Sequence, residues 1–222
     1  MGDLPVLYQC DIDTVFPGRW LNDQIIEYAL QRFGDPSNPG QAEREKKHSV
    51  AVLVPPSTSQ LFLHAPEVAA GIARDLHLDI SAGPILFCLN NATDVTLPLS
   101  GTHWTALVVV TETHGATRKV RHLHYDSMRG RVNDHIAERM SDTLRAVFGT
   151  RDAALEHVVS LNGRQENAHD CGVFLLAVAQ AYTEGAREGQ EAIDRLVDGI
   201  DQASAHALRR QLLESLVGDR SL

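Results

Sequence analysis

The chain has 222 residues, of which 43% are hydrophobic and 22% are charged, and this balance excludes disorder as its main state. Its 29 acidic and 20 basic residues give a formal net charge of −9, which argues against binding to nucleic acid or to an anionic membrane surface. No stretch approaches the roughly 18 uninterrupted apolar residues of a membrane span, so none is expected.

The spacing of apolar residues predicts a mixture of helices and strands. In chain order we expect a helix over residues 21–33, a loop over 34–47, a strand over 49–54, a helix over 66–76, strands over 85–89, 105–110 and 120–125, a helix over 135–148, a strand over 157–161, and helices over 171–182, 192–200 and 204–217. Helices and strands that do not strictly alternate favour an α+β fold. With no repeat or linker, residues 1–222 are predicted to form one domain.

The compartment is predicted from the cysteines and the N-terminus. Cys10, Cys88 and Cys171 cannot all pair with one another, so a disulfide scaffold is not expected. The first residues lack the basic head and apolar run of a secretory signal. We therefore expect a reduced protein of the cytoplasm or nucleus.

The sharpest local motif is His169-Asp170-Cys171-Gly172, which directly precedes an apolar run. A cysteine at the first position of a buried helix faces the positive end of the helix dipole, which favours a reactive thiolate. Asp170 is a candidate cap for this helix, and Gly172 lets another chain segment approach closely. The plainer interpretation of Cys171 is a small buried residue at a helix start.

A thiolate nucleophile needs a general base, and the base needs a group that orients it. His103 directly precedes one predicted strand, and Asp126 directly follows the next. If these strands are antiparallel neighbours, the start of the first lies beside the end of the second, and His103 meets Asp126. Taken singly, His103 could be a surface histidine and Asp126 a turn residue.

Acyl chemistry also needs hydrogen-bond donors for an oxyanion. The backbone N–H of Cys171 is one candidate at the helix start. The side-chain amide of Gln165, six residues earlier in a polar loop, is a second. Taken alone, Gln165 would be interpreted as a solvated loop residue.

Four motifs in order resemble the ubiquitin-like-protein-specific cysteine proteases, namely the sentrin/SUMO proteases and their deneddylase relative. They are Trp20-Leu21-Asn22-Asp23, Gly101-Thr102-His103-Trp104, Tyr125-Asp126-Ser127 and Gln165-x-Asn167-x-x-Asp170-Cys171-Gly172. The resemblance implies a papain-like α+β core with a mixed central sheet flanked by helices. It also implies a catalytic triad of Cys171, His103 and Asp126, with Gln165 as the oxyanion donor.

By the same resemblance, Trp20 and Trp104 border a narrow slot that admits only a Gly-Gly tail, because any Cβ would clash there. Asp23 is expected to anchor the N-terminal segment or to contact the modifier. The residues that make up these motifs favour the deneddylase branch, whose substrate is the neddylation modifier. SUMO is the alternative modifier. Selectivity between modifiers is expected to come from exposed loops, especially residues 34–47 and 90–100.

Other functions remain open on the sequence alone. A non-cutting binding module of the same fold would not need all of Cys171, His103, Asp126 and Gln165. An acyltransferase or a bacterial effector that acts inside a host cell would also fit the motif set, although no Gly-rich phosphate-binding loop is present. We expect no cofactor and a monomer whose partner is a ubiquitin-like modifier and its conjugates.

Three histidines could in principle belong to a metal site. His122 and His124 lie on one face of a predicted strand, with His114 nearby. No third ligand stands at a recognisable spacing, so partly buried strand histidines are the favoured interpretation and no metal is expected.

Overall fold

A computed structural model describes residues 4–34, 51–94, 100–115, 117–128, 132–158, 164–186 and 188–218. The loop expected at 34–47 lies outside these residues except for Gly34, as do residues 95–99 of the loop expected at 90–100. Among the described helices, none has the length and apolar character needed to cross a membrane.

The described strands form a five-stranded sheet in which spatial order follows chain order. The strands are β1 (Val52–Val54), β2 (Ile85–Asn90), β3 (Trp104–His114), β4 (Thr117–Tyr125) and β5 (Ala154–Val158). The outer pairs β1–β2 and β4–β5 are parallel, whereas β2–β3 and β3–β4 are antiparallel. The sheet is therefore mixed, as predicted.

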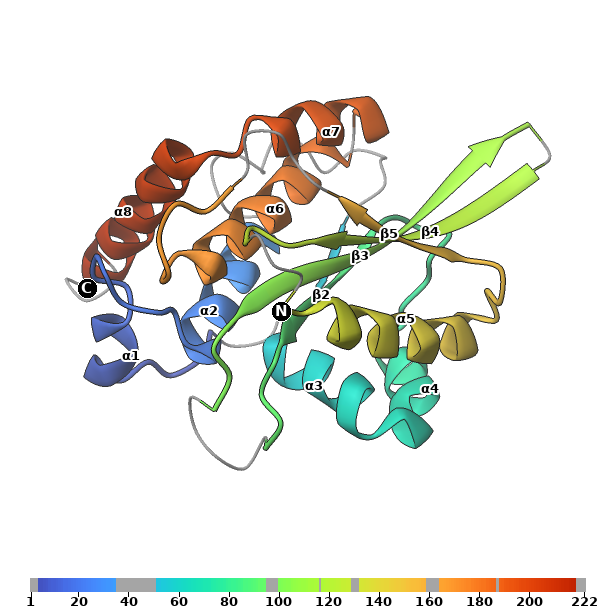
Figure 1. Ribbon diagram of the computed structural model, residues 1–222, viewed down its shortest axis with the longest axis horizontal. Coiled ribbons are helices and arrows are strands. Elements are labelled where there is room, and N and C mark those ends of the chain that lie inside the picture. The colour runs from blue at the N-terminus through green and yellow to red at the C-terminus, as the bar shows by residue number, and fades with distance from the viewer. Residues whose placement is uncertain are drawn as a thin grey trace.

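Helices cover both faces of the sheet (Figure 1). The described helices are α1 (Gln9–Asp13), α2 (Asp23–Gly34), α3 (Pro56–His64), α4 (Pro66–Asp75), α5 (Asp134–Phe148), α6 (Cys171–Gly185), α7 (Gln190–Asp198) and α8 (Gln202–Gly218). Buried side chains of α3, α4 and α5 form one apolar cluster with the sheet, and those of α2, α6, α7 and α8 form another.

The strand β2 shows why the sheet must be covered on both sides. All six of its residues are buried. Leu86 and Cys88 belong to the cluster around α6, whereas Ile85 and Phe87 belong to the cluster around α5. Successive side chains of a strand point to opposite faces, so a continuous apolar run requires two apolar layers.

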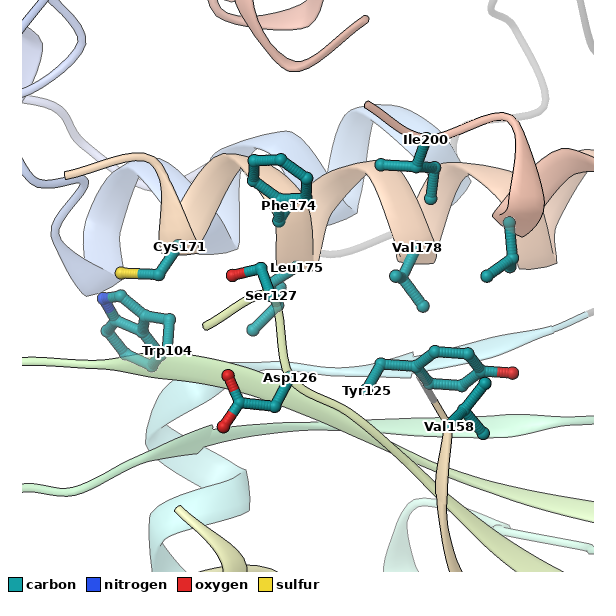
Figure 2. A pocket seen from close by; sticks show the side chains of 11 residues that line it. Trp104, Tyr125, Asp126, Ser127, Val158, Cys171, Phe174, Leu175, Val178 and Ile200 are labelled. Carbon is teal, nitrogen blue, oxygen red and sulfur yellow. The ribbon is translucent and has the colours of Figure 1, made fainter. Parts of the chain in front are cut away.

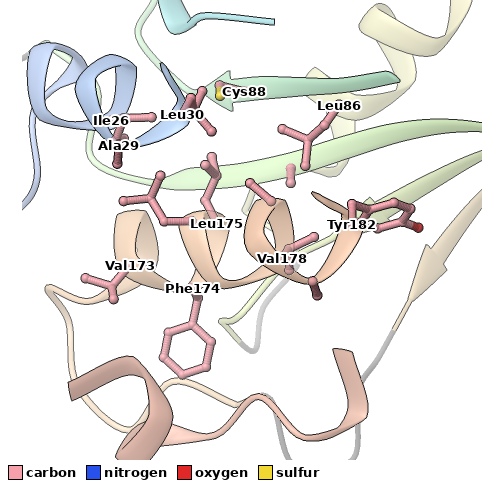
Figure 3. Close-up of a cluster of buried hydrophobic side chains, with 14 of the residues drawn as sticks. Ile26, Ala29, Leu30, Leu86, Cys88, Val173, Phe174, Leu175, Val178 and Tyr182 are labelled. Atoms are coloured by element: carbon pink, nitrogen blue, oxygen red, sulfur yellow. The ribbon is translucent and has the colours of Figure 1, made fainter. Parts of the chain in front are cut away.

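The helix α6 is the centre of the larger apolar layer (Figure 3). Leu175 points from α6 toward the sheet, and Phe174 points the other way. Both side chains are buried, as are Val173 and Leu176. A helix that is apolar all round must be enclosed, which confirms the prediction of a buried central helix beginning at Cys171.

Most predicted elements are present within a few residues of their expected bounds, and the α+β class is confirmed. The exceptions are α1 and α3, which were not predicted. At five residues, α1 is too short to show a helical period, and α3 begins at the pair Pro55-Pro56, which was not interpreted as a helix start. Strand β5 begins at Ala154 rather than at residue 157, and residues 159–161 lie outside the described part.

The Asn22 side chain links the N-terminal segment to the start of α2. Asn22 Oδ1 accepts a hydrogen bond from the Ile25 backbone N–H at 3.1 Å, so Asn22 caps α2. Its Nδ2 donates to Asp11 Oδ1 at 2.8 Å, and this contact is buried. Trp20 and Leu21, which lie between Asp11 and Asn22 in the chain, are thereby held in place.

Candidate active site

Cys171 is the first residue of α6 and is only 2% exposed. Its neighbour Gly172 is tightly packed: a Cβ there would lie 3.1 Å from Leu21 Cβ and 3.4 Å from Trp104 Cδ1, so these neighbours would have to move by a few tenths of an ångström. The absence of a Cβ therefore lets the N-terminal segment and the start of β3 approach the cysteine closely, as the sequence predicted.

The structure brings His103 and Asp126 together. His103 directly precedes β3 and Asp126 directly follows β4, and the antiparallel register pairs Ala106 with Tyr125. His103 Nε2 donates to Asp126 Oδ1 at 2.7 Å. The imidazole is 2% exposed and the carboxylate 12%, so solvent screens this pair only weakly.

The charge state of His103 follows from its neighbours. Burial alone would lower the pKa of His103, but the hydrogen bond to Asp126 and the adjacent Cys171 thiol outweigh it and raise the pKa to about 9. Nδ1, the other ring nitrogen, is buried and makes no hydrogen bond of normal geometry with the residues that the structure describes. The imidazole therefore favours its protonated form at neutral pH and keeps one ring nitrogen available.

Two asparagines that the sequence did not single out hold the backbone at His103. Asn91 Oδ1 accepts hydrogen bonds from the backbone N–H groups of Thr102, at 2.7 Å, and His103, at 3.0 Å. On the other side, Asn133 Nδ2 donates to the His103 carbonyl at 3.2 Å. Neither residue lies in a recognisable motif, so no sequence signal points to them.

Asp126 is held by its own turn as well as by the histidine. Its Oδ1 accepts a hydrogen bond from the Met128 backbone N–H at 2.9 Å. The turn interpretation and the orienting role considered for Asp126 are therefore compatible, because one oxygen serves both contacts.

Gln165 lies in the loop before α6, half-buried, with its amide held at both ends. Ser127 Oγ donates to Gln165 Oε1 at 2.9 Å, and Gln165 Nε2 donates to the Asn167 carbonyl. The Gln165 backbone N–H also donates to the Ser127 carbonyl at 2.9 Å. These contacts tie the loop to the end of β4, next to Asp126, and Nε2 makes a second, long contact to Asn167 Oδ1 at 3.5 Å.

Asp170 is the N-cap residue of α6, as predicted, although it caps the helix through its backbone alone. Its backbone carbonyl accepts from Val173 and Phe174, but its carboxylate makes no capping hydrogen bond. The carboxylate instead accepts two hydrogen bonds from Arg209, from Nη2 at 2.7 Å and from Nε at 3.0 Å. Both guanidinium hydrogen bonds end on Oδ1, and charge-assisted bonds of this kind are stronger than one from a neutral backbone N–H, so the ion pair prevails.

Arg209 of α8 is the largest omission from the sequence-based site. Its side chain is 5% exposed and contacts the carbonyls of Thr14, Val15, Phe16 and His169 in addition to Asp170. One buried cation thus joins the N-terminal segment, the loop before Cys171 and α8. Arg209 lies 39 residues from Asp170 in the chain, and no local pattern indicates the pair.

Buried Asp170 stays ionised because of its partners. Burial would raise its pKa, but hydrogen bonds from Asn167 and Arg209 outweigh burial and hold the pKa below its ordinary value. Asn167 Nδ2 donates to Asp170 Oδ2 at 2.7 Å, and Gln202 Nε2 donates to the same oxygen at 2.7 Å.

Both tryptophans are attached to the surroundings of Cys171. Trp104 Nε1 donates to the Leu21 carbonyl at 3.1 Å, and Trp20 Nε1 donates to the Ala168 carbonyl at 2.7 Å. Trp104 is partly buried, whereas Trp20 is 46% exposed. Figure 2 shows the Trp104 indole beside the Cys171 sulfur, with Asp126 along the same edge.

A small cavity of about 30 Å³ begins at Cys171 and runs between α6 and the ends of β4 and β5 (Figure 2). Its lining is mainly apolar beyond Asp126 and Ser127. A space of this size holds about one water molecule, so the tail of a substrate would have to lie over the cavity rather than inside it.

Asp23 is exposed in the first turn of α2. The N-terminal segment is anchored by Asn22, through its contact with Asp11. The anchoring role expected for Asp23 therefore belongs to Asn22. Contact with a modifier is the role that remains proposed for Asp23.

The other two cysteines are placed differently from Cys171. All three are free, with Cys10 exposed in α1 and Cys88 enclosed in β2. Burial raises the pKa of the Cys88 thiol far above its ordinary value, so this thiol is inert at neutral pH. Neither of these cysteines lies at the start of a buried helix.

Of the zinc grouping of His122, His124 and His114, the described side chains of His122 and His124 have different partners, and the side chain of His114 lies outside the described part. His122 Nδ1 pairs with Ser141 Oγ at 2.8 Å, whereas His124 Nδ1 lies 3.0 Å from His157 Nδ1. His124 instead belongs to a cluster with His157 and Asp134, drawn from three different elements.

A cysteine at the start of a buried helix, beside an imidazole that an aspartate orients, is the arrangement of a papain-like cysteine protease. Residues 19–216 match the Ulp1 protease family, C-terminal catalytic domain. The match spans most of the sequence, and the chain belongs to this family of cysteine peptidases.

Similar proteins agree with the family. Sentrin-specific protease 8 of Mus musculus is 29% identical over 180 residues, which cover 81% of this chain and 75% of the relative. NEDD8-specific protease 1 of Arabidopsis thaliana is 26% identical over 186 residues, covering 83% and 74%. A crystal structure of "the de-sumoylating protease" shares the fold, with a TM-score of 0.62, 13% identity, and coverage of 94% of this chain and 84% of that one.

Proposed function

We propose that this protein is a thiol isopeptidase and processing protease that cleaves after the C-terminal Gly-Gly of a ubiquitin-like modifier, with the neddylation modifier favoured. The observation that carries the proposal is the His103–Asp126 pair, 2.7 Å apart, beside Cys171 at the start of α6. This arrangement supplies the nucleophile, the proton carrier and its orienting group.

In the proposed reaction, Cys171 Sγ attacks the carbonyl carbon of the last glycine as a thiolate, and a C–S bond forms. His103 transfers its proton to the leaving amine as the C–N bond breaks, which leaves a thioester on Cys171. Water then attacks the thioester, His103 takes a proton from that water, and the thiolate leaves. Because its pKa is about 9, His103 begins the cycle protonated at neutral pH.

Two donors are proposed for the oxyanion that forms in each attack. One is the Cys171 backbone N–H, which points out of the N-terminal end of α6. The other is Gln165 Nε2, whose carbonyl end is held by Ser127 Oγ at 2.9 Å. The second hydrogen of Nε2 has only a long contact, 3.5 Å to Asn167 Oδ1, and is proposed to donate to the oxyanion in its place.

Trp20 and Trp104 are proposed to border the slot for the modifier's tail. The Trp20 indole is held by its hydrogen bond to the Ala168 carbonyl, and the Trp104 indole by its hydrogen bond to the Leu21 carbonyl. A glycine passes between flat rings where a Cβ would clash. Asp23, exposed near Trp20 in the chain, is proposed to meet the body of the modifier.

The choice of modifier is supported by the names of the relatives. Two of them, from mouse and from Arabidopsis thaliana, are named sentrin-specific protease 8 and NEDD8-specific protease 1. The solved structure with the same fold is a de-sumoylating protease, so SUMO is the alternative modifier. We expect NEDD8 to be processed best.

A panel of modifier–aminomethylcoumarin conjugates tests this choice. The panel contains NEDD8, SUMO and ubiquitin, and kcat/KM is measured for each. We expect the highest value for NEDD8, and much faster cleavage of SUMO would reassign the modifier while leaving the chemistry intact. NEDD8 conjugates ending in Ala-Gly or Gly-Ala should lose most of their kcat/KM, because the added methyl clashes in the slot.

The nucleophile is tested with matched cysteine variants. Cys171→Ala should abolish turnover, whereas Cys10→Ser should retain it, since Cys10 is exposed in α1. Binding of NEDD8 to the Cys171→Ala variant should persist, which separates loss of chemistry from loss of the fold. Substantial turnover by Cys171→Ala would refute the proposed mechanism.

A further inference from the structure

A second cluster of titratable side chains lies apart from the proposed protease site. It consists of His124 on β4, His157 on β5 and Asp134 at the start of α5, and each offers one ligand atom within 4.8 Å of the others. His124 and His157 are direct register partners on adjacent parallel strands. The proposed protease chemistry gives none of the three a role.

The separations within this cluster match those of a metal site. His124 Nδ1 lies 3.0 Å from His157 Nδ1, and Asp134 Oδ1 lies 3.2 Å from His157 Nδ1 and 3.7 Å from His124 Nδ1. Metal–ligand bonds of about 2.0–2.1 Å place the ligands of a tetrahedral ion about 3.3–3.4 Å apart. The three atoms therefore form one face of a tetrahedron of suitable size.

The outer contact of His124 suits ligation. His124 Nε2 lies 3.1 Å from Thr105 Oγ1, and with its N–H on Nε2 the ring donates to that oxygen and presents a lone pair at Nδ1. A metal-bound histidine almost always donates its other N–H to an oxygen in this way.

We propose that His124, Asp134 and His157 form a binding site for a divalent transition-metal ion of the Zn²⁺ class, with three protein ligands and a fourth position open to solvent. His124 is buried and fixes the site, and exposed His157 gives the ion a path from solvent. In the proposed metal-free state, His157 carries its proton on Nδ1 and donates it to His124 Nδ1. When the ion binds, this proton moves from Nδ1 to Nε2 of His157, and both Nδ1 atoms present a lone pair to the ion.

The ligand set selects the class of ion. Two imidazoles and one carboxylate suit zinc, cobalt, nickel and copper, whereas calcium and magnesium prefer sites made mainly of oxygen. Asp134 also offsets the partial positive charge at the N-terminal end of α5, which would otherwise oppose a cation.

The site must be distinguished from the protease centre, because a thiol beside an imidazole also binds zinc. Thr105 Oγ1 links the two regions, since it contacts both His124 and Asn133, and Asn133 Nδ2 reaches the His103 carbonyl. The test therefore uses the Cys171→Ala protein, in which the protease thiol is absent.

Zn²⁺ is titrated into the full chain carrying Cys171→Ala, without a polyhistidine tag, and binding is measured by calorimetry. Co²⁺ is added separately, because tetrahedral Co²⁺ gives intense visible absorption. We expect one equivalent to bind and to raise Tm. Adding His157→Ala should weaken binding at least tenfold and remove the Tm rise, since even loss of an outer contact costs about 10–100-fold.

His135→Gln is the matched control, because His135 is exposed on α5 and adjoins Asp134 without joining the cluster. This variant should bind Zn²⁺ as tightly as its Cys171→Ala parent. Asp134→Asn gives a second test with little change of shape and should also weaken binding at least tenfold. Melting curves without metal establish that each variant is folded.

The proposal is overturned if the Cys171→Ala protein binds no Zn²⁺. It is also overturned if the His157→Ala and Asp134→Asn variants bind as tightly as their parent. Equal Tm shifts with Mg²⁺ and Zn²⁺ would likewise reject a transition-metal site. None of these results bears on the proposed protease activity.

Discussion

Arg209 offers the sharpest test of how the fold supports the site. Replacing Arg209 with Met removes the cation that pairs with Asp170 but keeps most of the apolar stem. Asp170 is 1% exposed, so its carboxylate would be left buried without its charge partner. Removing one member of a buried ion pair costs about 3–5 kcal/mol.

This loss corresponds to a Tm drop on the order of 10 °C for a chain of this size. The unfolding free energy is measured by urea denaturation and Tm by circular dichroism. Arg210→Met is the matched control, because Arg210 is the next residue of α8 and is exposed, and it should change stability by less than about 0.5 kcal/mol. The double variant with Asp170→Asn should recover part of the loss, since the buried charge is gone.

Equal stability of Arg209→Met and Arg210→Met would refute the reasoning. It would mean that the hydrogen bonds Asp170 already accepts from Asn167 and Gln202 suffice to hold its charge, or that Asp170 is protonated with little loss of free energy. Failure of the double variant to recover any stability would show that the backbone contacts of Arg209, rather than its charge, stabilise the fold.

Three further predictions concern pH, packing and positioning. The pKa of His103 is raised from 6.5 to about 9, so its ionisation should contribute about 3 kcal/mol to the unfolding free energy below pH 6.5 and lose this contribution as pH rises through 9. The difference in unfolding free energy between wild type and His103→Gln, measured with urea, should therefore shrink over that range. Gly172→Ala should destabilise the protein by about 1–3 kcal/mol, because the added Cβ presses against Leu21. Gly71→Ala in α4 should instead stabilise it by about 0.5–1 kcal/mol, because a Cβ there meets nothing within 4 Å. Both changes are measured by urea denaturation. The opposite sign for either glycine would contradict the packing account. Asn133→Ala should lower kcat with little change in KM, because Asn133 bonds to the His103 carbonyl and to no proposed substrate position, and an effect confined to KM would reject this role.

Much of the fold could be predicted because its signals are local. The apolar run at Cys171 predicts the buried helix α6, and continuous apolar strands predict two covering layers. The meeting of His103 with Asp126 follows from one assumption, that β3 and β4 are antiparallel neighbours, and the register bears it out. That residues 1–222 form one domain, and the roles of the site residues, stay predictions.

The contacts that the sequence did not predict join residues far apart in the chain. Arg209 contacts Asp170 across 39 residues, and Asn133 contacts His103 across 30. The cluster of His124, Asp134 and His157 draws its third ligand from a parallel strand reached only after α5. Such pairs are fixed by tertiary packing, and the spacing of residue types in the sequence does not determine them.

The most direct test of the central claim is covalent capture of the nucleophile. NEDD8 carrying an electrophile in place of its last carboxyl group is incubated with the protein, and the modified residue is identified by peptide mass spectrometry. The account predicts a single adduct on Cys171, with its formation slowed strongly in His103→Ala. An adduct on Cys10 or Cys88 would contradict it. So would a Cys171 adduct that forms no faster in the wild-type protein than in His103→Ala.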